Sequence, residues 1–479
     1  MRAAGGRGAV ARGRGVAAGV LPSDLGSYQQ AVRLALTSDL ITSARPRPGA
    51  LEQVLQWADQ LTRDFRELFG YTVIATTRQV RVVRRLDAFD ETQRHLFAKK
   101  GKPFDRRRLA YLCLVLALFQ RSRVEISLAD LVGAFAPAAN AIEGLGFDPT
   151  IGAHKAAVVD CLDWLVERGA LRLSDGSLDA WAHDTERGDA LFDIDHDICA
   201  ILFRPARPVQ HLTSAAGLLE GFASGGASRA RPEDAARRAR RVLVEQPVVY
   251  FAQVEPEVAD ALRHPGLATD LARLTGLAVE RRAEGVMLAD PGGRFTDKPF
   301  PGRGGAVNRA AGLLLGKMAD LLEDPDERRT VTFLEPPRDA DDQRDLLARI
   351  DSALPRSGVV RELAWAPPPV TEPHAGGTPS PETALVEQAR LTAMLGELYE
   401  ELGAASFSSA WQHDPEGLLD AAVTLLAELR LVRRHPGGVL LLPAFARYRN
   451  IALALPDRRR SEAQLGLHLS PSLPEDSRS

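Results

Sequence analysis

Carboxylates and imidazoles gather in one stretch of the 479-residue chain, and such side chains are the usual ligands of divalent metal ions. The alternation of a strand, however, places Asp193 and Asp195 on one face, opposite two apolar neighbours, while the remaining members fall in a long insertion. We therefore interpret the cluster as a solvated wing without a metal site, in which Asp195 or Asp197 caps the next helix. The cluster comprises His183, Asp184, Glu186, Asp189, Asp193, Asp195, His196 and Asp197.

No motif for nucleotide binding or hydrolysis accompanies these carboxylates. Gly316-Lys317 lies within a predicted helix, and Met318 stands where a phosphate-binding loop requires Ser or Thr. The chain has no Gly-x-Ser-x-Gly elbow, no His-Glu-x-x-His helix and no Cys-x-x-Cys pair. We predict no catalytic residue and no cofactor. The three cysteines lie far apart, so we predict buried free thiols in a reducing compartment at Cys113, Cys161 and Cys199.

Basic residues are the second group of candidates, because cationic side chains bind phosphate. The net charge is −3, so any contact with nucleic acid must come from local patches. His154 and Lys155 begin a predicted helix at the end that would contact a DNA groove, although an ordinary exposed turn explains them equally well. A solvated face is likewise the alternative for each arginine run. We predict weak DNA contact at Arg106, Arg107, Arg108, His154, Lys155, Arg237, Arg238, Arg240 and Arg241.

A helix, a glycine and a β-hairpin follow one another in the segment that carries His154 and Lys155. Apolar residues at three- and four-residue steps predict a helix over 154–168, Gly169 ends it, and alternating leucines begin a hairpin. The same order predicts hairpins that begin near Tyr71, Leu171, Leu277 and Leu431. The uneven gaps exclude a regular solenoid. This order is the back half of a winged-helix module. The sequence therefore predicts an α+β, predominantly helical fold of tandem winged-helix modules, each a three-helix unit with a hairpin wing.

Length and composition predict several globular domains, since 45% of the residues are hydrophobic and 26% are charged. The longest apolar run, at 109–119, is too short to span a bilayer, so we expect a cytoplasmic protein without membrane contact. Single helices are predicted over 256–275 and 382–402. The expected divisions are a disordered basic tail over 1–23, a helix–hairpin module over 24–90, a winged-helix domain over 91–210, a middle winged-helix-like domain over 211–365, a linker over 366–382, a C-terminal winged-helix domain over 383–455 and a disordered tail over 456–479.

Four segments carry a resemblance to a known family: LTSDLIT at 36–42, DRRRLAYLCLVLALF at 105–119, DCLDWLVERGALRLSDG at 160–176 and FDIDHDICAILF at 192–203. They resemble a bacterial family, common in actinobacteria, that is encoded in four-gene cassettes beside an SMC-like ATPase. Such cassettes resemble Wadjet-type anti-plasmid systems, and within them this chain looks like the MukE-type, or KITE, subunit. The four predicted hairpins exceed the two winged helices of a minimal KITE protein.

The resemblance implies a non-catalytic accessory subunit of a condensin-like SMC complex that recognises plasmid DNA and helps to eliminate it. Its implied partners are the SMC-like ATPase complex, a kleisin-like subunit and double-stranded DNA, bound weakly and without sequence preference. It also implies a homodimer within the complex and a location near the nucleoid or plasmid. One alternative is a winged-helix transcription regulator, which the acidic residues Asp160, Asp163 and Glu167 of the 154–168 helix disfavour. The other is a metal-dependent nuclease that uses Asp193 and Asp195.

Overall fold

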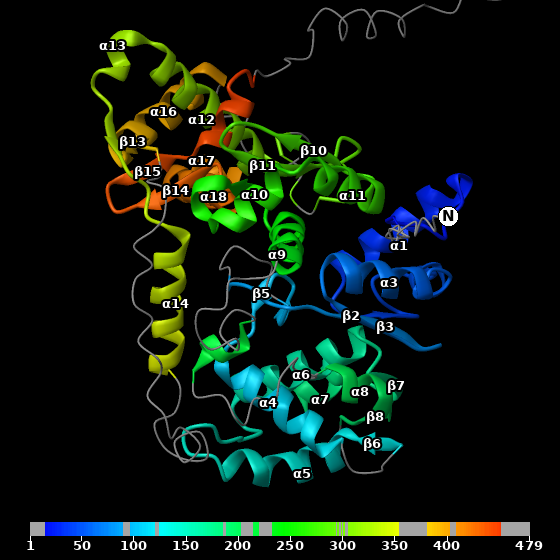
Figure 1. Ribbon diagram of the computed structural model, residues 1–479. Coiled ribbons are helices and arrows are strands. Elements are labelled where there is room, and N and C mark those ends of the chain that lie inside the picture. The colour runs from blue at the N-terminus through cyan, green and yellow to red at the C-terminus, as the bar shows by residue number, and fades with distance from the viewer. Residues whose placement is uncertain are drawn as a thin grey trace, which may run out of the picture. The chain divides into compact units, whose positions relative to one another are not determined.

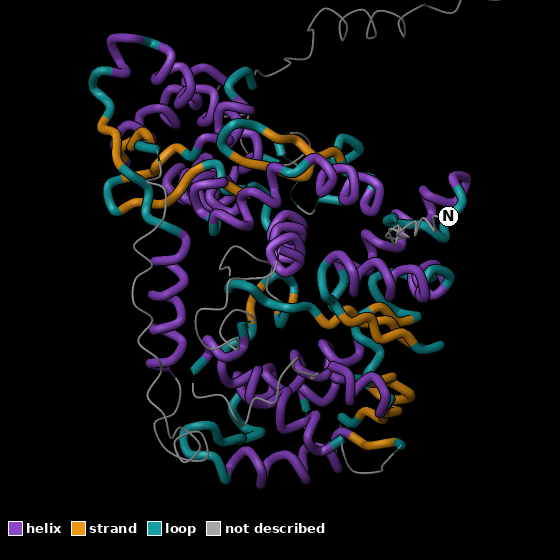
Figure 2. The backbone as a smooth tube through the Cα atoms, viewed as in Figure 1, coloured by secondary structure: helices purple, strands orange, loops and turns teal. Residues whose placement is uncertain are grey.

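The described part of the chain is predominantly helical with small antiparallel sheets, which confirms the predicted α+β class (Figures 1 and 2). The computed structural model describes residues 15–89, 96–119, 124–184, 188–202, 214–219, 232–293, 295–296, 298, 300–301, 305–353, 381–402 and 409–451. Across these ranges, no helix combines the length and the apolar character needed to cross a membrane.

One order of elements occurs four times in the described ranges: a helix, a short strand, two helices and a β-hairpin. We call each copy a module. In every module the last strand lies in the middle of the sheet and pairs antiparallel with the other two, so the strand order is first, third, second. All four predicted hairpins are therefore confirmed. The modules span 25–83, 106–194, 232–289, and 306–323 together with 383–441.

Modules 1 and 3 share one hydrophobic core, to which Tyr28 and Phe65 of module 1 and Leu262 and Leu271 of module 3 contribute fully buried side chains. Module 1 consists of α1 (Leu25–Thr37), β1 (Ile41–Thr42), α2 (Ala50–Leu55), α3 (Ala58–Leu68), β2 (Thr72–Ala75) and β3 (Gln79–Val83). Module 3 consists of α9 (Pro232–Glu245), β9 (Val249–Tyr250), α10 (Pro256–Arg263), α11 (Pro265–Thr275), β10 (Ala278–Arg281) and β11 (Gly285–Ala289).

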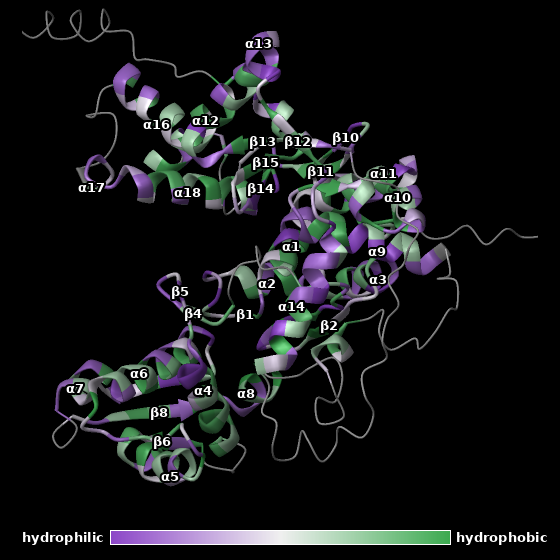
Figure 3. Ribbon diagram, turned by 90° about the vertical axis from the view of Figure 1, so that its left-hand side faces the viewer, coloured by the Kyte–Doolittle hydropathy of each residue, from purple (hydrophilic) through white to green (hydrophobic). Residues whose placement is uncertain are grey.

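Module 2 has its own core, in which the rings of Tyr111, Phe135 and Phe147 meet edge to face. Figure 3 shows its central strand largely in the colour of apolar residues. The module consists of α4 (Arg106–Leu118), β6 (Glu125–Ser127), α5 (Leu128–Asn140), α6 (Gly152–Glu167), β7 (Leu171–Gly176) and β8 (Ala190–Ile194). Additional elements are the hairpin β4 (Ala98–Lys99) and β5 (Lys102–Pro103), helix α7 (Leu178–His183) inside the wing, and α8 (His196–Leu202) after it.

Polar side chains cap two helices of module 2, and the second of these caps confirms the prediction made for Asp195. The Ser127 side chain accepts the N–H of Asp130 and so caps α5. Asp195 caps α8, because its Oδ1 accepts the N–H of Ile198 at 3.1 Å. Short polar side chains before a helix satisfy N–H groups that the helix itself leaves without a partner.

Module 4 belongs to a separate compact unit, formed by the described residues within 298–334 and 382–451. It consists of α12 (Ala306–Glu323), β13 (Thr383–Glu387), α16 (Gln388–Leu402), α18 (Pro415–Glu428), β14 (Val432–His435) and β15 (Gly438–Leu441). The same unit holds α13 (Pro325–Arg328), β12 (Thr332–Leu334), which pairs with β13, and α17 (Ser409–Gln412). The remaining helix, α14 (Asp339–Ala353), lies in the first unit, where Asp351 accepts the Ser214 hydroxyl at 2.6 Å.

The structure corrects the predicted middle domain, 211–365, because α12 and β12 pack in the C-terminal unit. The chain leaves that unit to form α14 and then returns, and this path has no signal in the local pattern. The predicted disordered tail, 1–23, is also too long. Residues 15–20 pack against α3 with Val16, Ala17 and Val20 buried, whereas 1–14 lie outside the described residues. Residues 366–380 and 456–479, predicted as linker and tail, likewise lie outside them.

Two single helices predicted from the sequence are divided in the structure. The helix over 256–275 breaks between Arg263 and Pro265, where proline lacks the N–H that would continue the first helix and instead begins the second. The helix over 382–402 begins with strand β13, because Leu385 and Val386 pair with β15 across the sheet.

Candidate nucleic-acid interface

The arginine triplet begins α4, and its three side chains have different surroundings. Arg106 is exposed and has no ion pair in the described ranges. Arg107 donates to the Gly146 carbonyl at 3.0 Å and to the Tyr111 hydroxyl at 3.1 Å, so it fixes the loop before α6 onto α4. Arg108 binds Asp160 at 2.7 Å. Within the triplet, Arg106 is the side chain that remains open to a phosphate.

The acidic face of α6 is neutralised from inside module 2. Asp160 lies 2.7 Å from Arg108 of α4 and 3.0 Å from the Nζ of Lys99 on β4, which also binds Asp163. Burial lowers the pKa of Lys99, but its hydrogen bonds to both carboxylates outweigh that effect, so the pKa is raised. Negative charge on α6 disfavours its insertion into a DNA groove. The same carboxylates hold α4 and the β4–β5 hairpin against α6.

His154 and Lys155 are engaged at the start of α6. The Nδ1 of His154 accepts the N–H of Asp148 at 3.1 Å, and its ring stacks on Phe147. Burial, and then the charge of Arg107, lowers the pKa of His154. Lys155 donates to the Ala182 carbonyl at 2.8 Å. Both side chains thus anchor the loop and the wing to α6 instead of projecting from its N-terminus.

All four candidate arginines of α9 bind partners within modules 1 and 3 or the segments that follow their hairpins. Arg237 donates to the Glu67 carbonyl at 3.1 Å. Arg241, which is 5% exposed, donates to the Phe69 carbonyl at 2.8 Å and to both oxygens of Asp87 at 2.6 and 2.7 Å. The other two form ion pairs, Arg238 with Glu255 at 2.7 Å and Arg240 with Asp270 at 2.8 Å. The run read as a phosphate-binding patch is a set of internal contacts.

The electrostatics of Arg241 agree with an internal role. Burial lowers the pKa of its guanidinium, but the two hydrogen bonds and the charge of Asp87 outweigh burial, so the pKa is raised. Its neighbour Glu245 accepts the hydroxyl of Tyr71, and burial raises the pKa values of both groups. The sequence shows the basic run but not these partners, which lie more than a hundred residues earlier in the chain.

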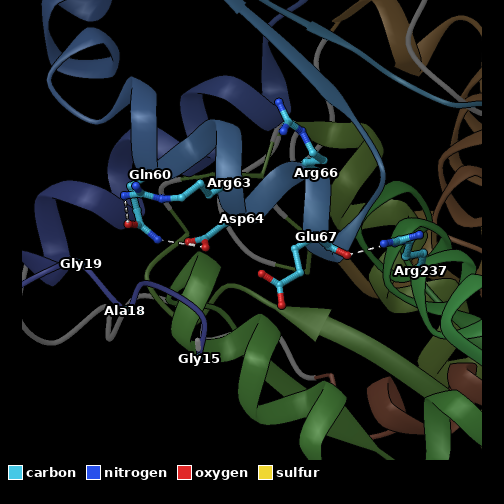
Figure 4. A pocket seen from close by; sticks show the side chains of 9 residues that line it. All are labelled: Gly15, Ala18, Gly19, Gln60, Arg63, Asp64, Arg66, Glu67 and Arg237. Carbon is cyan, nitrogen blue, oxygen red and sulfur yellow. Dashed lines mark hydrogen bonds between the residues drawn. The ribbon is translucent and has the colours of Figure 1, made fainter. Parts of the chain in front are cut away.

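An open cavity of about 590 Å³ lies beside α3, residues 15–19 and α9. Figure 4 shows three arginines around it that do not converge: Arg63 is directed toward Gln60, Arg66 points away, and Arg237 reaches the carbonyl of Glu67. The cavity wall also includes the carboxylates of Asp64 and Glu67. This mixture of charges is not a cradle for an anion.

Asp64 is the polar centre of this wall. It is 5% exposed and accepts the Tyr28 hydroxyl at 2.5 Å and the Ala17 N–H at 3.1 Å, while Gln60 donates to its other oxygen at 3.0 Å. Burial, and then the hydrogen bond to Asp64, raises the pKa of Tyr28. Asp64 thereby holds residues 15–20 on α3, which explains why this part of the predicted tail is ordered.

The acidic cluster of the wing has basic partners. Asp193 pairs with Arg172, and Asp195 lies 2.6 Å from Arg78. Asp189 accepts the N–H groups of Ala129 and Ala190. Glu186 lies outside the described residues, and among those that are described no group of three or more potential ligands is arranged to hold a metal ion.

The cysteines divide into two buried thiols and one exposed thiol. Cys161 and Cys199 are buried, and burial raises the pKa of each to about 12. Cys113 is exposed, which corrects the prediction that all three are buried. It lies on α4, whose nearly uniform apolar sequence does not reveal which face is covered.

The comparisons with known proteins give one match. A family model described as "Protein of unknown function (DUF2398)" matches residues 32–450, which is most of the chain and includes the described elements from the middle of α1 to the C-terminal hairpin. No curated protein and no solved structure matches the chain. The protein therefore belongs to the DUF2398 family.

Proposed function

We propose that this DUF2398 protein is a non-catalytic, MukE-like or KITE-like accessory subunit of a condensin-like SMC complex that recognises plasmid DNA and helps to eliminate it. It would bridge a kleisin-like subunit and double-stranded DNA near the nucleoid or plasmid. The observation that carries the proposal is the fourfold order of helix, strand, two helices and hairpin, with the third strand in the centre of each sheet. This is the element order of a winged helix, so we take the four modules as tandem winged helices.

The surroundings of the basic residues favour an accessory role over a sequence-reading one. A transcription regulator of this class needs side chains at the start of its recognition helix that reach base edges. In module 2 those positions hold His154 and Lys155, which bind the loop and the wing. Exposed cations such as Arg106 supply contacts to phosphate, which position DNA without reading its sequence.

Co-purification tests the proposal. The full chain, tagged and expressed with its neighbouring genes, is expected to recover an SMC-like ATPase and a kleisin-like protein. A matched tagged protein from an unrelated locus serves as the control for recovery of abundant DNA-associated proteins. Recovery of the chain without either partner, together with tight binding to one operator sequence, would favour the transcription regulator instead.

The nuclease alternative makes a different prediction. If Asp193 and Asp195 performed metal-dependent cleavage, alanine at both positions would abolish plasmid cutting by the assembled system. We expect cutting to persist in that double variant, because the two carboxylates pair with Arg172 and Arg78 in the structure. Loss of cutting with an intact complex would contradict the non-catalytic role.

A further inference from the structure

Modules 1 and 3 pack on each other in a reciprocal way. The first helix of module 1, α1, packs on α11, the last helix of module 3. The first helix of module 3, α9, packs in turn on α3, the last helix of module 1. In a two-fold dimer, element i of one subunit contacts element j of the other, and element j of the first contacts element i of the second. The contacts between modules 1 and 3 follow this isologous pattern.

The hydrogen bonds from α9 define one half of this interface. Arg237 and Arg241 lie four residues apart and therefore on the same face of α9. They donate to the carbonyls of Glu67 and Phe69, at 3.1 and 2.8 Å. These carbonyls lie at the C-terminal end of α3, just before Gly70, whose φ of 70° ends the helix.

The hydrogen bonds from α1 define the other half at matching positions. Gln29 and Arg33, again four residues apart, donate to the carbonyls of Arg273 and Thr275, at 2.9 and 3.0 Å. These carbonyls lie at the C-terminal end of α11, just before Gly276, whose φ is 71°. Each first helix thus caps the end of the other module's last helix, where carbonyls without partners attract cations.

Arg241 and Arg33, which bind the carbonyls just before the two glycines, each have a second partner, and the chemistry of that partner differs between the two halves. The segment after β3 supplies Asp87, which binds Arg241 through both carboxylate oxygens. The segment after β11 supplies Phe295, whose ring centroid lies 3.5 Å from the Cζ of Arg33. The interface is therefore reciprocal in position, while the two halves have diverged in sequence.

We propose that modules 1 and 3 form an internal dimer, so that one chain contains the winged-helix pairing that separate accessory subunits make as a homodimer. A minimal KITE protein has two winged helices, so two fused copies would have four, which is the number of modules described in this chain. This inference rests on the proposed function, because that function identifies the chain as an accessory subunit that would otherwise act with a second copy of itself. It assigns Gln29, Arg33, Arg237 and Arg241 to the interface between the two modules.

The mass of the intact protein tests the internal dimer directly. Native mass spectrometry of the full chain at micromolar concentration is expected to give the single-chain mass of 51.9 kDa. When the chain is recovered with its partners, the complex is expected to contain one copy of this chain at each position that a homodimeric accessory subunit would occupy. A stable dimer of whole chains would overturn the inference even if the SMC-like partners are recovered. Loss of those partners with a monomeric chain would instead overturn the proposed function.

Hydrogen exchange of two interface variants tests the reciprocal caps. In the full chain, Arg241→Ala is expected to increase amide exchange near residues 67–71, and Arg33→Ala near residues 273–277. Modules 1 and 3 are expected to unfold in one shared transition, and both variants should lower the midpoint temperature of that transition. Arg106→Ala, an exposed arginine of module 2, is the control. If either arginine variant does not fold, Gln29→Ala and Arg237→Ala report on the same two helix ends. Separate unfolding transitions for the two modules, with changes confined to one of them, would overturn the internal dimer.

Discussion

At the scale of single residues, burial and partners distinguish two arginines that a sequence presents as equivalent. Arg106 and Arg241 both lie in basic runs, yet the first is exposed and the second is 5% exposed between Asp87 and the Phe69 carbonyl. Local caps such as Ser127 and Asp195 could be predicted, because their partners lie three residues away. The partners of Arg241 could not be predicted, because folding brings them together from distant parts of the chain.

Replacement of Arg241 by alanine is expected to destabilise the protein by about 3 kcal/mol, because the partly buried Asp87 would keep only the more distant guanidinium of Arg238, 3.8 Å away. Asp87 would lose two hydrogen bonds and the end of α3 its cap. Arg106→Ala is the matched control and should change stability by less than about 0.5 kcal/mol. Chemical denaturation of both variants gives the comparison, and equal stabilities would contradict the internal role of Arg241.

The low pKa of His154 predicts a pH effect on the loop before α6. Burial, and then Arg107, disfavours the protonated ring in the folded protein, although Asp148 opposes this. The unfolded chain therefore takes up the proton first as the pH falls. Stability from this site is present above the unfolded value of 6.5 and is lost as the pH falls through 6.5 toward the lower folded pKa.

Protonation also removes the acceptor for the Asp148 N–H, so we expect faster amide exchange of residues 147–152 at about pH 5.5 than at about pH 7.5, after correction for intrinsic rates. His154→Gln removes the titrating group and serves as the control. The same protection at both pH values in the unmodified protein would show that this contact does not depend on the neutral ring.

At the scale of elements, the hairpins could be predicted and the first strands could not. Each hairpin is a local pattern of apolar residues after a helix stop, and three of the four stops are glycines with positive φ, at 70, 169 and 276. The first strands are only two to five residues long and form by pairing with the distant third strand. Strand β1, for example, is Ile41–Thr42, too short for any alternation to be visible.

Close approach of the first and third strands predicts the effect of a glycine substitution in module 4. Gly438 begins β15, has a φ of 149°, and an added Cβ would lie 2.1 Å from the Val386 carbonyl oxygen on β13. Since backbone cannot move aside easily, Gly438→Ala should cost about 2 kcal/mol or more and loosen β13. Thermal unfolding and amide exchange of residues 383–387 give the measurement.

The control for this substitution lies in the same module. Gly396 is inside α16, and an added Cβ there would have no neighbour within 4 Å. Because alanine is a better helix former than glycine, Gly396→Ala should stabilise the protein by about 0.5–1 kcal/mol. Destabilisation by both substitutions would indicate that module 4 tolerates no change at its glycines, and would remove the evidence for close strand contact.

At the scale of the whole molecule, the assembly of modules depends on contacts that no local pattern reveals. Modules 1 and 3 share a core although module 2 separates them in the sequence. The first helix of module 4 is separated from the rest of that module by α14, which belongs to the other unit. For this reason the hairpins of the four modules could be predicted from the sequence, whereas the short β4–β5 hairpin was missed and the grouping of residues 211–365 into one domain was wrong.

The charge of the whole chain predicts how the proposed DNA contact would behave. With a net charge of −3 and most candidate cations paired internally, few phosphate contacts are available, so binding should be weak and the same for unrelated duplexes. Each contact releases counterions, so affinity should fall between about 50 mM and about 200 mM salt. Fluorescence anisotropy with two duplexes of unrelated sequence measures both properties.

If the proposed contact of Arg106 with phosphate forms, Arg106→Ala should reduce the slope of log affinity against log salt by about 1, because one phosphate contact would be lost. Arg329→Ala is the control, since that guanidinium is also exposed but has Asp326 as an ion-pair partner 2.8 Å away. An unchanged slope for Arg106→Ala would place the DNA contact elsewhere on the chain. Tight binding to one duplex but not to the other would contradict the accessory role itself, because phosphate contacts cannot distinguish sequences.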